Sequence, residues 1–274
     1  KFFDSVAWDL MVKAVQANVT HEQRWIVLYV QRWLAAPIRT PEGGVVGRDR
    51  GTPQGSAISP ALANLFMHYA FDSWLEREFP TVAFERYADD AVVHCVTEWQ
   101  ARKVLAALET RMEQVGLQLH PTKTKIVYCK DRNRRLDCEH TSSPVLGDTF
   151  GARKAPTRDQ SSMFSAFLPA ASADAVRSMG AVIRSWRLHL RTTTDLAELA
   201  RWINPVVRGW MNYYGRFYRT EILALLRRIN TYLVRWARRR FTRLRSFKKA
   251  QRWWKGLVQR QPGLFAHWAW MTEF

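Results

Sequence analysis

Residues 81–95 read TVAFERYADDAVVHC and place two adjacent acids, Asp89 and Asp90, between two apolar runs. Each run has the length and composition of a short strand, so the acids fall at the tight turn of a predicted β-hairpin. Acids at such a turn project from a rigid sheet and offer the oxygen ligands that Mg²⁺ prefers. An ordinary turn containing aspartates is the alternative, and the surrounding sequence has to distinguish the two interpretations.

The charge of the chain is divided unequally between its two halves. The 274 residues carry a net charge of +18. Residues 1–150 contain 18 basic and 18 acidic side chains, whereas residues 151–274 contain 24 basic and 6 acidic ones. A strongly basic half predicts a polyanionic partner. Nucleic acid is favoured over a membrane surface because Trp and Tyr residues are interleaved with the arginines.

The expected compartment follows from hydropathy and cysteine usage. No apolar run approaches the 18 residues of a membrane-spanning helix, so we expect a soluble, cytoplasmic protein without a membrane partner. Cys95, Cys129 and Cys138 are odd in number and lack the spacing of metal ligands. We therefore expect free or buried thiols in a reducing compartment, and no zinc site.

The first half has the pattern of helices packed on a small antiparallel sheet. Asp4 or Ser5 would cap a helix over about residues 6–17, and Thr20 with Gln23 predicts a capping box for a second helix. That second helix would end near Ala35, before a hairpin and loop over residues 38–50.

A long helix is predicted to begin at Ser59, as the N-cap, with Pro60 in its first turn. Another helix, with a capping box formed by Thr97 and Gln100 at its start, would end at Gly116. Short strands are then expected over residues 117–119 and 125–128. The apolar stripe predicted to enter the core from the first of these helices is Leu62, Leu65, Phe66 and Tyr69.

Several motifs around the acidic hairpin resemble those of reverse transcriptases, and they occur in the same order. The Tyr-x-Asp-Asp of residues 87–90 resembles the metal-binding motif of that family. Residues 51–56, GTPQGS, and 59–64, SPALAN, resemble the loop and helix beside the nascent base pair and the template. Residues 116–125, GLQLHPTKTK, resemble the next motif, and 145–150, VLGDTF, resemble the primer grip.

The resemblance implies a role for individual residues in two-metal nucleotidyl transfer. Asp89 is implied to be the principal catalytic ligand of Mg²⁺, for which Mn²⁺ is an alternative, and Asp90 a weaker ligand. A solvated turn lysine remains the alternative interpretation of Lys123. The residues implied to contact the template or the deoxynucleoside triphosphate are Gln54, Gly55, Tyr87 and Lys123.

The second half narrows the resemblance to group II intron-encoded reverse transcriptases. Residues 202–214, WINPVVRGWMNYY, resemble their thumb or maturase region, and residues 262–268, PGLFAHW, resemble their tail. No zinc- or HNH-type endonuclease motif occurs in the given residues, so we expect a chain that resembles the endonuclease-lacking bacterial lineage. The implied fold is α+β: a right-hand polymerase palm in residues 1–150, truncated at its amino end, and an all-α basic thumb and maturase region in 151–274.

Basic side chains in this second half are expected to bind group II intron-like RNA and the duplex of RNA template and DNA primer. A solvated basic face is the alternative. The apolar side of the same helices is predicted to be Leu223, Leu226, Tyr232, Leu233 and Trp236. The predicted RNA-binding residues are Arg208, Arg227, Arg228, Arg235, Arg238, Arg239, Arg240, Arg243, Arg245, Lys248 and Lys249.

One departure from the family concerns its first catalytic acid, which precedes a Phe-Asp pair that is Phe3-Asp4 here. That acid would fall upstream of Lys1, and Phe2 and Phe3 would form the end of a central strand. We expect Asp4 to be a structural acid and the chain alone not to extend a primer. The implied function is RNA-directed DNA synthesis with assistance to splicing. A non-catalytic RNA-binding splicing factor and a domesticated, defence- or CRISPR-associated reverse transcriptase remain alternatives.

Overall fold

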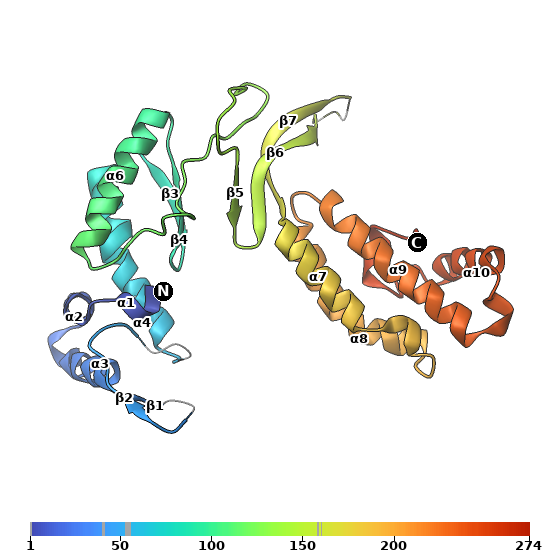
Figure 1. Cartoon of the computed structure of the whole chain (residues 1–274), viewed down its shortest axis with the longest axis horizontal. Helices are drawn as coiled ribbons and strands as arrows, with labels where there is room; N and C mark the ends of the chain where they lie inside the picture. The colour runs from blue at the N-terminus through green and yellow to red at the C-terminus, as the bar shows by residue number, and fades with distance from the viewer. Residues whose placement is uncertain (1, 40–41, 53–55, 158, 160) are drawn as a thin grey trace. The chain divides into compact units, whose positions relative to one another are not determined.

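A computed structural model describes residues 2–39, 42–52, 56–157, 159 and 161–274 of the chain. The chain divides into two compact units, Lys1–Ile126 and Val127–Phe274, each with its own hydrophobic core. The division expected after residue 150 falls inside a strand of the second unit. We describe each unit by itself (Figure 1).

The first unit combines helices with two short antiparallel hairpins, and its fully buried side chains include Met11, Leu34 and Leu75. Phe84 of the second hairpin packs edge-on against Phe71 of the helical layer, with ring centroids 5.4 Å apart. The strands are β1 (Ile38–Arg39), β2 (Val45–Val46), β3 (Ala83–Tyr87) and β4 (Asp90–His94). The helices are α1 (Phe2–Ser5), α2 (Trp8–Gln16), η1 (His21–Gln23), α3 (Arg24–Ala35), α4 (Ser59–Met67), η2 (His68–Asp72), α5 (Ser73–Glu78) and α6 (Glu98–Gln114).

The predicted long helix is confirmed, since α4, η2 and α5 follow one another without a break. Its middle section, η2, is a π-helical turn. Leu62 and Phe66 are buried as predicted, whereas Tyr69 is 38% exposed and lies at the edge of the core. Ser59 is already the first helical residue, so the prediction that it is the N-cap is wrong by one position.

The helix boundaries set by capping chemistry are largely confirmed. The Gln23 side chain accepts a hydrogen bond from the backbone N–H of Thr20, as a capping box requires. Thr97 accepts one from the N–H of Gln100 at 3.1 Å. At the other end of α6, the N–H of Leu117 reaches the carbonyl of Met112, because Gly116 has a φ of +75° that closes a Schellman turn.

Other predictions for the first unit are wrong. Asp4 does not cap α2, because Phe2–Ser5 form a short helix of their own and Ala7 is the N-cap. Phe2 and Phe3 therefore do not end a strand. Residues 117–119 and 125–128 are not strands either. A strand forms only where a neighbouring strand completes its ladder of hydrogen bonds, and local sequence alternation cannot supply that neighbour.

The second unit contains a three-stranded antiparallel sheet in the order β5-β6-β7 and a set of long helices (Figure 1). The prediction that residues 151–274 are all-α is wrong, because β6 and β7 extend to Ala171; the helices begin at Ala173. The strands are β5 (Ser142–Val145), β6 (Asp148–Pro156) and β7 (Met163–Ala171). The helices are α7 (Ala173–Ser185), η3 (Leu188–Leu190), α8 (Leu196–Tyr214), α9 (Thr220–Arg240), η4 (Thr242–Leu244), α10 (Phe247–Arg260) and η5 (Ala266–Ala269).

At the coarser level, the expected α+β class is confirmed by this mixture of helices and small antiparallel sheets. Leu226, Leu233 and Trp236 of α9 are buried, and Leu223 and Tyr232 are partly buried against the same core, as predicted. The three cysteines are free, also as predicted. Across the described ranges, no helix is both long enough and apolar enough to cross a membrane.

Two buried asparagines fasten the carboxyl-terminal tail of the second unit. Asn204 of α8 donates to the carbonyl of Leu264 at 3.0 Å and accepts from the N–H of Ala266 at 2.9 Å. Asn230 of α9 is fully buried and donates to the carbonyls of Met271 and Glu273, at 3.0 and 2.7 Å. An amide has both donors and an acceptor, so one side chain can bond both N–H and C=O groups of the tail.

His267 joins the Asn230 network and is fully buried. Because the Asn230 amide nitrogen faces two carbonyls, its Oδ1 is the acceptor for the His267 Nε2–H at 2.7 Å and for the Trp268 indole at 3.0 Å. The other ring nitrogen, Nδ1, is buried without a partner in the described protein. Burial therefore lowers the pKa of His267 from its ordinary value of 6.5 to about 3.

This buried histidine predicts a loss of stability in mild acid. Below pH 6.5 the unfolded chain binds a proton at His267, whereas the folded chain does not until about pH 3. The free energy of unfolding should therefore fall by up to about 1.4 kcal/mol per pH unit as the pH drops through this window. Urea unfolding at several pH values measures it. His267→Gln should have a shallower pH slope, and the exposed control His21→Gln should keep it; equal slopes would contradict the prediction.

Candidate active site and nucleic-acid interface

The two acids lie at the turn of the hairpin formed by β3 and β4. Tyr87 pairs with Asp90 across the strands, so Ala88 and Asp89 alone form the two-residue loop. Both carboxylates are exposed, and neither forms a hydrogen bond or ion pair with another residue in the part of the chain that the structure describes. The predicted hairpin, with the acids at its tip, is confirmed: Asp89 lies in the loop and Asp90 begins β4.

The backbone of this turn is strained. Ala88 has a φ of +54°, a left-handed conformation that glycine usually adopts at the first position of a tight hairpin turn. A side chain at this φ costs roughly 1 kcal/mol, and the surrounding structure must hold the residue there. The carbonyl of Ala88 accepts a hydrogen bond from Arg86 Nη1 at 2.8 Å, which fixes the turn immediately before Asp89.

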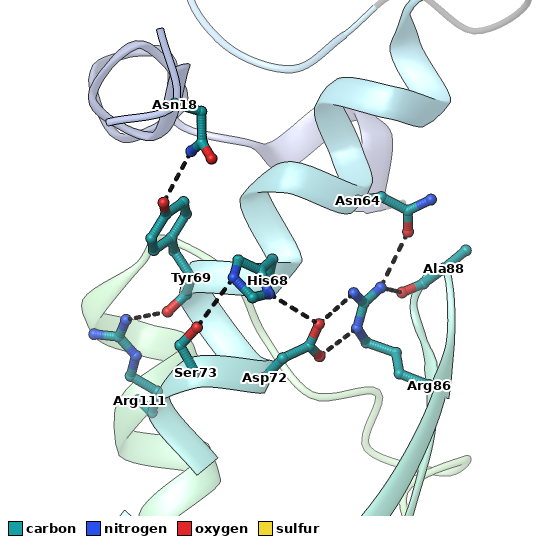
Figure 2. Close-up of polar contacts among 9 residues, drawn as sticks. All are labelled: Asn18, Asn64, His68, Tyr69, Asp72, Ser73, Arg86, Ala88 and Arg111. Atoms are coloured by element: carbon teal, nitrogen blue, oxygen red, sulfur yellow. Dashed lines mark hydrogen bonds and ion pairs between the residues drawn. The ribbon is translucent and has the colours of Figure 1, made fainter. Parts of the chain in front are cut away.

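Arg86 connects the turn to the long helix (Figure 2). Its Nε and Nη2 each lie 2.6 Å from one carboxylate oxygen of Asp72, in a bidentate pair. Its Nη1 also donates to Asn64 Oδ1 at 3.1 Å. The side chains of Arg86 and Asp72 are only 11% and 18% exposed, so solvent screens this pair weakly. One guanidinium thus fixes the hairpin against α4 and η2.

The π-helical turn supplies part of this arrangement. Asp72 is its last residue, and His68, its first, lies 3.7 Å from Asp72 through Nδ1 and bonds to Ser73 through Nε2. A π-helical turn widens the helix and frees carbonyls for other donors. Arg111 of α6 donates to the carbonyl of Tyr69 at 3.1 Å (Figure 2). It also donates to the carbonyl of Ala70 at 3.0 Å.

The donor set is consistent with part of a magnesium site. Asp89 and Asp90 offer unpaired carboxylate oxygens, the chemistry that Mg²⁺ and Mn²⁺ prefer. Within the described residues, however, no group of three His, Cys, Asp or Glu side chains is close enough to hold a metal ion. The hairpin therefore provides an incomplete ligand set on its own.

The other residues predicted to contact the template or the triphosphate are Tyr87, Lys123, Gln54 and Gly55. Tyr87 is 67% exposed beside the acids. Lys123 is exposed in a turn, and no hydrogen bond or ion pair links it to either acid in the described ranges. Gln54 and Gly55 lie outside the residues that the structure describes. The roles of all four residues stay predictions.

The start of the GTPQGS motif has a tightly fitted backbone. Gly51 has a φ of +76°, and a Cβ at this position would lie 2.7 Å from the carbonyl oxygen of Phe3. The N–H of Gly51 donates to the carbonyl of Val6. The indole N–H of Trp8 donates to the carbonyl of Gly51 at 2.7 Å. Only glycine satisfies both the φ and the space, so the motif begins from a position fixed against α1 and α2.

Two motifs of the second unit contact each other. The turn between β5 and β6 is Leu146-Gly147, both with positive φ, within the predicted primer-grip segment. Tyr213 of α8 donates to the carbonyl of Leu146 at 2.7 Å, and the hydroxyl of Tyr214 lies 3.1 Å from where a Cβ of Gly147 would be. The WMNYY sequence thus holds this turn in place.

The predicted RNA-binding residues divide into two groups. In the first, side chains are engaged by the protein: Arg238 donates to the carbonyl of Arg245, Arg240 to those of Thr192 and Thr194, and Arg227 pairs with Glu273. In the second, no hydrogen bond or ion pair of the side chain occurs within the described residues. The members of this second group are Arg208, Arg228, Arg235, Arg239, Arg243, Arg245, Lys248 and Lys249.

The ionisation of His189 reflects the charge of the second group. This ring stacks on Tyr232 at 5.3 Å. Burial first, and then the charges of Arg239, Arg235 and Arg187, lower the pKa of His189. The arginines of α9 therefore create a positive potential on this side of the helix.

Comparison with known protein families gives two matches that cover successive parts of the chain. A model described as reverse transcriptase (RNA-dependent DNA polymerase) matches residues 1–167. A model described as the group II intron, maturase-specific domain matches residues 176–254. Among curated proteins, no relative matches the chain.

Because the first match covers more than half of the chain, the chain belongs to the reverse transcriptase family. The maturase-specific domain that follows makes it a group II intron reverse transcriptase and maturase. The family predicted from the Tyr-x-Asp-Asp hairpin and the second-half motifs is thus confirmed.

Sequence reasoning missed the residues that support the acids. Asn64, His68 and Asp72 recur at a spacing of four along an otherwise apolar helix, which places them on one face. A cation directly before the Tyr-x-Asp-Asp motif, Arg86, is the natural partner of that face. The four-residue spacing of these polar side chains is the sequence signal that indicates such a face.

The Arg86–Asp72 pair gives a stability prediction with a matched control. Arg86→Gln leaves a largely buried carboxylate without its cation and should lower the free energy of unfolding by about 3 kcal/mol. Arg102 forms a similar two-nitrogen contact with Glu98, but those side chains are 71% and 66% exposed. Arg102→Gln should therefore cost less than about 1 kcal/mol. Urea unfolding compares the two, and equal losses would show that Arg86 does not brace the hairpin.

Proposed function

We propose that the first unit acts as the palm of an RNA-directed DNA polymerase and that its acidic hairpin contributes to the catalytic centre. The observation that carries this proposal is the pair of exposed, unpartnered carboxylates at a turn braced by Arg86. Asp89 would be the principal ligand of Mg²⁺ or Mn²⁺, and Asp90 the weaker one. When bound, the metal would activate the primer hydroxyl and stabilise the leaving oxygen.

The side chains around the hairpin have supporting roles in this proposal. Tyr87 borders the acids, and with Gln54 and Gly55 it would contact the template and the deoxynucleoside triphosphate. Lys123 would neutralise charge on the triphosphate. Arg86 would have a supporting role: by directing its donors to Asp72, Asn64 and the turn carbonyl, it leaves Asp89 and Asp90 free of a neighbouring counter-ion.

We further propose that the helices of the second unit act as a thumb and maturase region that binds intron RNA and the primer–template duplex and assists splicing. The arginines and lysines of α9, η4 and α10 whose side chains form no hydrogen bond or ion pair within the described residues would contact phosphates. Arg238 and Arg240 have a different role, because their guanidiniums are bonded to backbone carbonyls. A non-catalytic splicing factor is the second candidate, favoured by the maturase-specific match.

Primer extension on an RNA template tests the catalytic part. The assay uses the chain preceded by a segment that supplies the family's first catalytic acid, with Mg²⁺ and deoxynucleoside triphosphates. Asp89→Asn should reduce the rate on the order of 10³-fold or more, because it removes a ligand needed in the transition state. Glu85→Gln, an exposed acid on the same hairpin, is the matched control and should leave the rate nearly unchanged. Wild-type synthesis by Asp89→Asn would refute the assignment, and no synthesis with intact RNA binding would favour the splicing factor.

Salt-dependent RNA binding tests the second unit. Replacing both Arg235 and Arg239 by Gln should flatten the slope of log affinity against log salt by roughly 1.4 to 1.8, since each neutralised phosphate contributes about 0.7 to 0.9 to that slope. Replacing Arg102 and Lys103 on α6 of the first unit removes the same charge and should leave the slope unchanged. Filter binding of structured intron RNA measures both. An unchanged slope in the first variant would mean that these arginines form only a solvated face.

A further inference from the structure

A hollow of about 690 Å³ lies within the second unit, bordered by β6, the end of β7, α7 and α9. Four arginines line it, Arg153, Arg177, Arg184 and Arg228, and Glu221 is the one acid among its lining residues. The apolar part of the wall comes from Ala171, Val176 and Leu225. Except for Arg228, none of these arginines belongs to the RNA-binding set predicted from the sequence.

The charges of this hollow are only partly balanced by the protein. Glu221 pairs with Arg153 at 3.0 Å, and Arg153, 19% exposed, also lies over the ring of Tyr218. Arg177 pairs with Asp174 at 2.9 Å on the exposed side of α7. Arg184 and Arg228 have no carboxylate partner in the part of the chain that the structure describes. The charges of Arg184 and Arg228 are therefore available to an external anion.

These two arginines converge over Gly180 of α7. The point where a Cβ of Gly180 would lie is 3.1 Å from Arg228 Nη1 and 3.5 Å from Arg184 Nη1. Guanidinium groups that approach one another in this way repel unless an anion lies between them. Glycine inside a helix costs about 1 kcal/mol of stability relative to alanine. At position 180 it lowers the stability of α7 and leaves room beside the two guanidinium groups. Both arginines are exposed, so a ligand can reach the space from solvent.

We propose that this hollow is a phosphate-binding site in which Arg184 and Arg228 hold the anion and the Arg153–Glu221 pair forms its fixed wall. Guanidinium groups match the geometry of phosphate oxygens and form charge-assisted, bidentate hydrogen bonds with them. The ligand is a phosphodiester of the RNA backbone. This identity rests on the RNA-binding function proposed above, whereas the anion site itself rests on the arginine geometry alone.

The first test measures the anion site with inorganic pyrophosphate as the probe. Binding is followed by titration calorimetry or by NMR of the arginine side chains. The double variant Arg184→Gln/Arg228→Gln should bind pyrophosphate at least about tenfold more weakly, because it removes the charge-assisted hydrogen bonds of both guanidiniums. Arg201→Gln/Arg252→Gln removes two exposed charges that do not line the hollow and should bind like the wild type. Equal affinity in both double variants would overturn the site.

Gly180→Ala tests the geometry without changing the charge. Its methyl group would occupy the point between the two guanidiniums, so pyrophosphate affinity should fall at least about fivefold while the melting temperature stays the same or rises. Gly209→Ala in α8 is the matched control, because nothing lies within 4 Å of a Cβ there. Undiminished affinity in Gly180→Ala would overturn the arrangement.

A second experiment identifies whether the bound phosphate is a phosphodiester of RNA or a free or terminal phosphate. For an RNA oligonucleotide without terminal phosphates, the salt slope of binding should be smaller by about 0.7 to 0.9 in Arg184→Gln/Arg228→Gln, as expected for one phosphodiester. If RNA binding keeps its wild-type slope while pyrophosphate binding disappears, the hollow takes a free or terminal phosphate and the RNA assignment is overturned. If the chain binds pyrophosphate at this site but no RNA, the anion site stands and the proposed RNA-binding function fails.

Discussion

The first unit depends on the placement of one guanidinium. Arg86 donates to acceptors from three separate segments: Asp72 in η2, Asn64 in α4, and the carbonyl of Ala88 in the hairpin turn. Lysine, a single point of charge, cannot span this set, whereas the planar fork of arginine can. Because Ala88 is held at a positive φ, the energy of its backbone has to be compensated by such contacts. The position of Asp89 therefore depends on Arg86, three residues before it.

Local irregularities concentrate around this guanidinium for a physical reason. The π-helical turn widens the helix at His68–Asp72 and frees the carbonyls of Tyr69 and Ala70, which Arg111 then satisfies from α6. Arg111 gives both carbonyls a charge-assisted hydrogen bond, which stabilises the π turn. Two arginines therefore hold two irregular backbone segments, one in the helix and one in the hairpin.

Sequence patterns were informative where a structure depends on neighbouring residues. The acidic hairpin, the box at Thr20, the N-cap at Thr97 and the buried side of α9 are set by spacings of two to four residues, and all were predicted. The predicted box at Thr97 is only half formed, because the Gln100 side chain accepts from the N–H of Val96 instead of that of Thr97. Predictions were wrong where the structure depends on residues that are distant in the sequence. Residues 125–128 look like a strand, but the backbone bond from the N–H of Tyr128 to the carbonyl of His140, at 2.8 Å, does not extend into a ladder in the described structure. A basic run such as 238–240 looks uniform, yet folding brings carbonyls from residues 192, 194 and 245 to two of its three members.

The same distinction changes how the net charge of +18 should be interpreted. A sequence count treats every arginine as available, but Arg227, Arg238 and Arg240 already have protein acceptors and hold the tail, η4 and the loop before α8. Removing them would disturb the fold as well as the charge. Arg239 and the pair that meets over Gly180 have no such acceptor in the described structure, so their charge is still unneutralised. Affinity for a polyanion should therefore follow this smaller set, and the arrangement of its members, rather than the total charge.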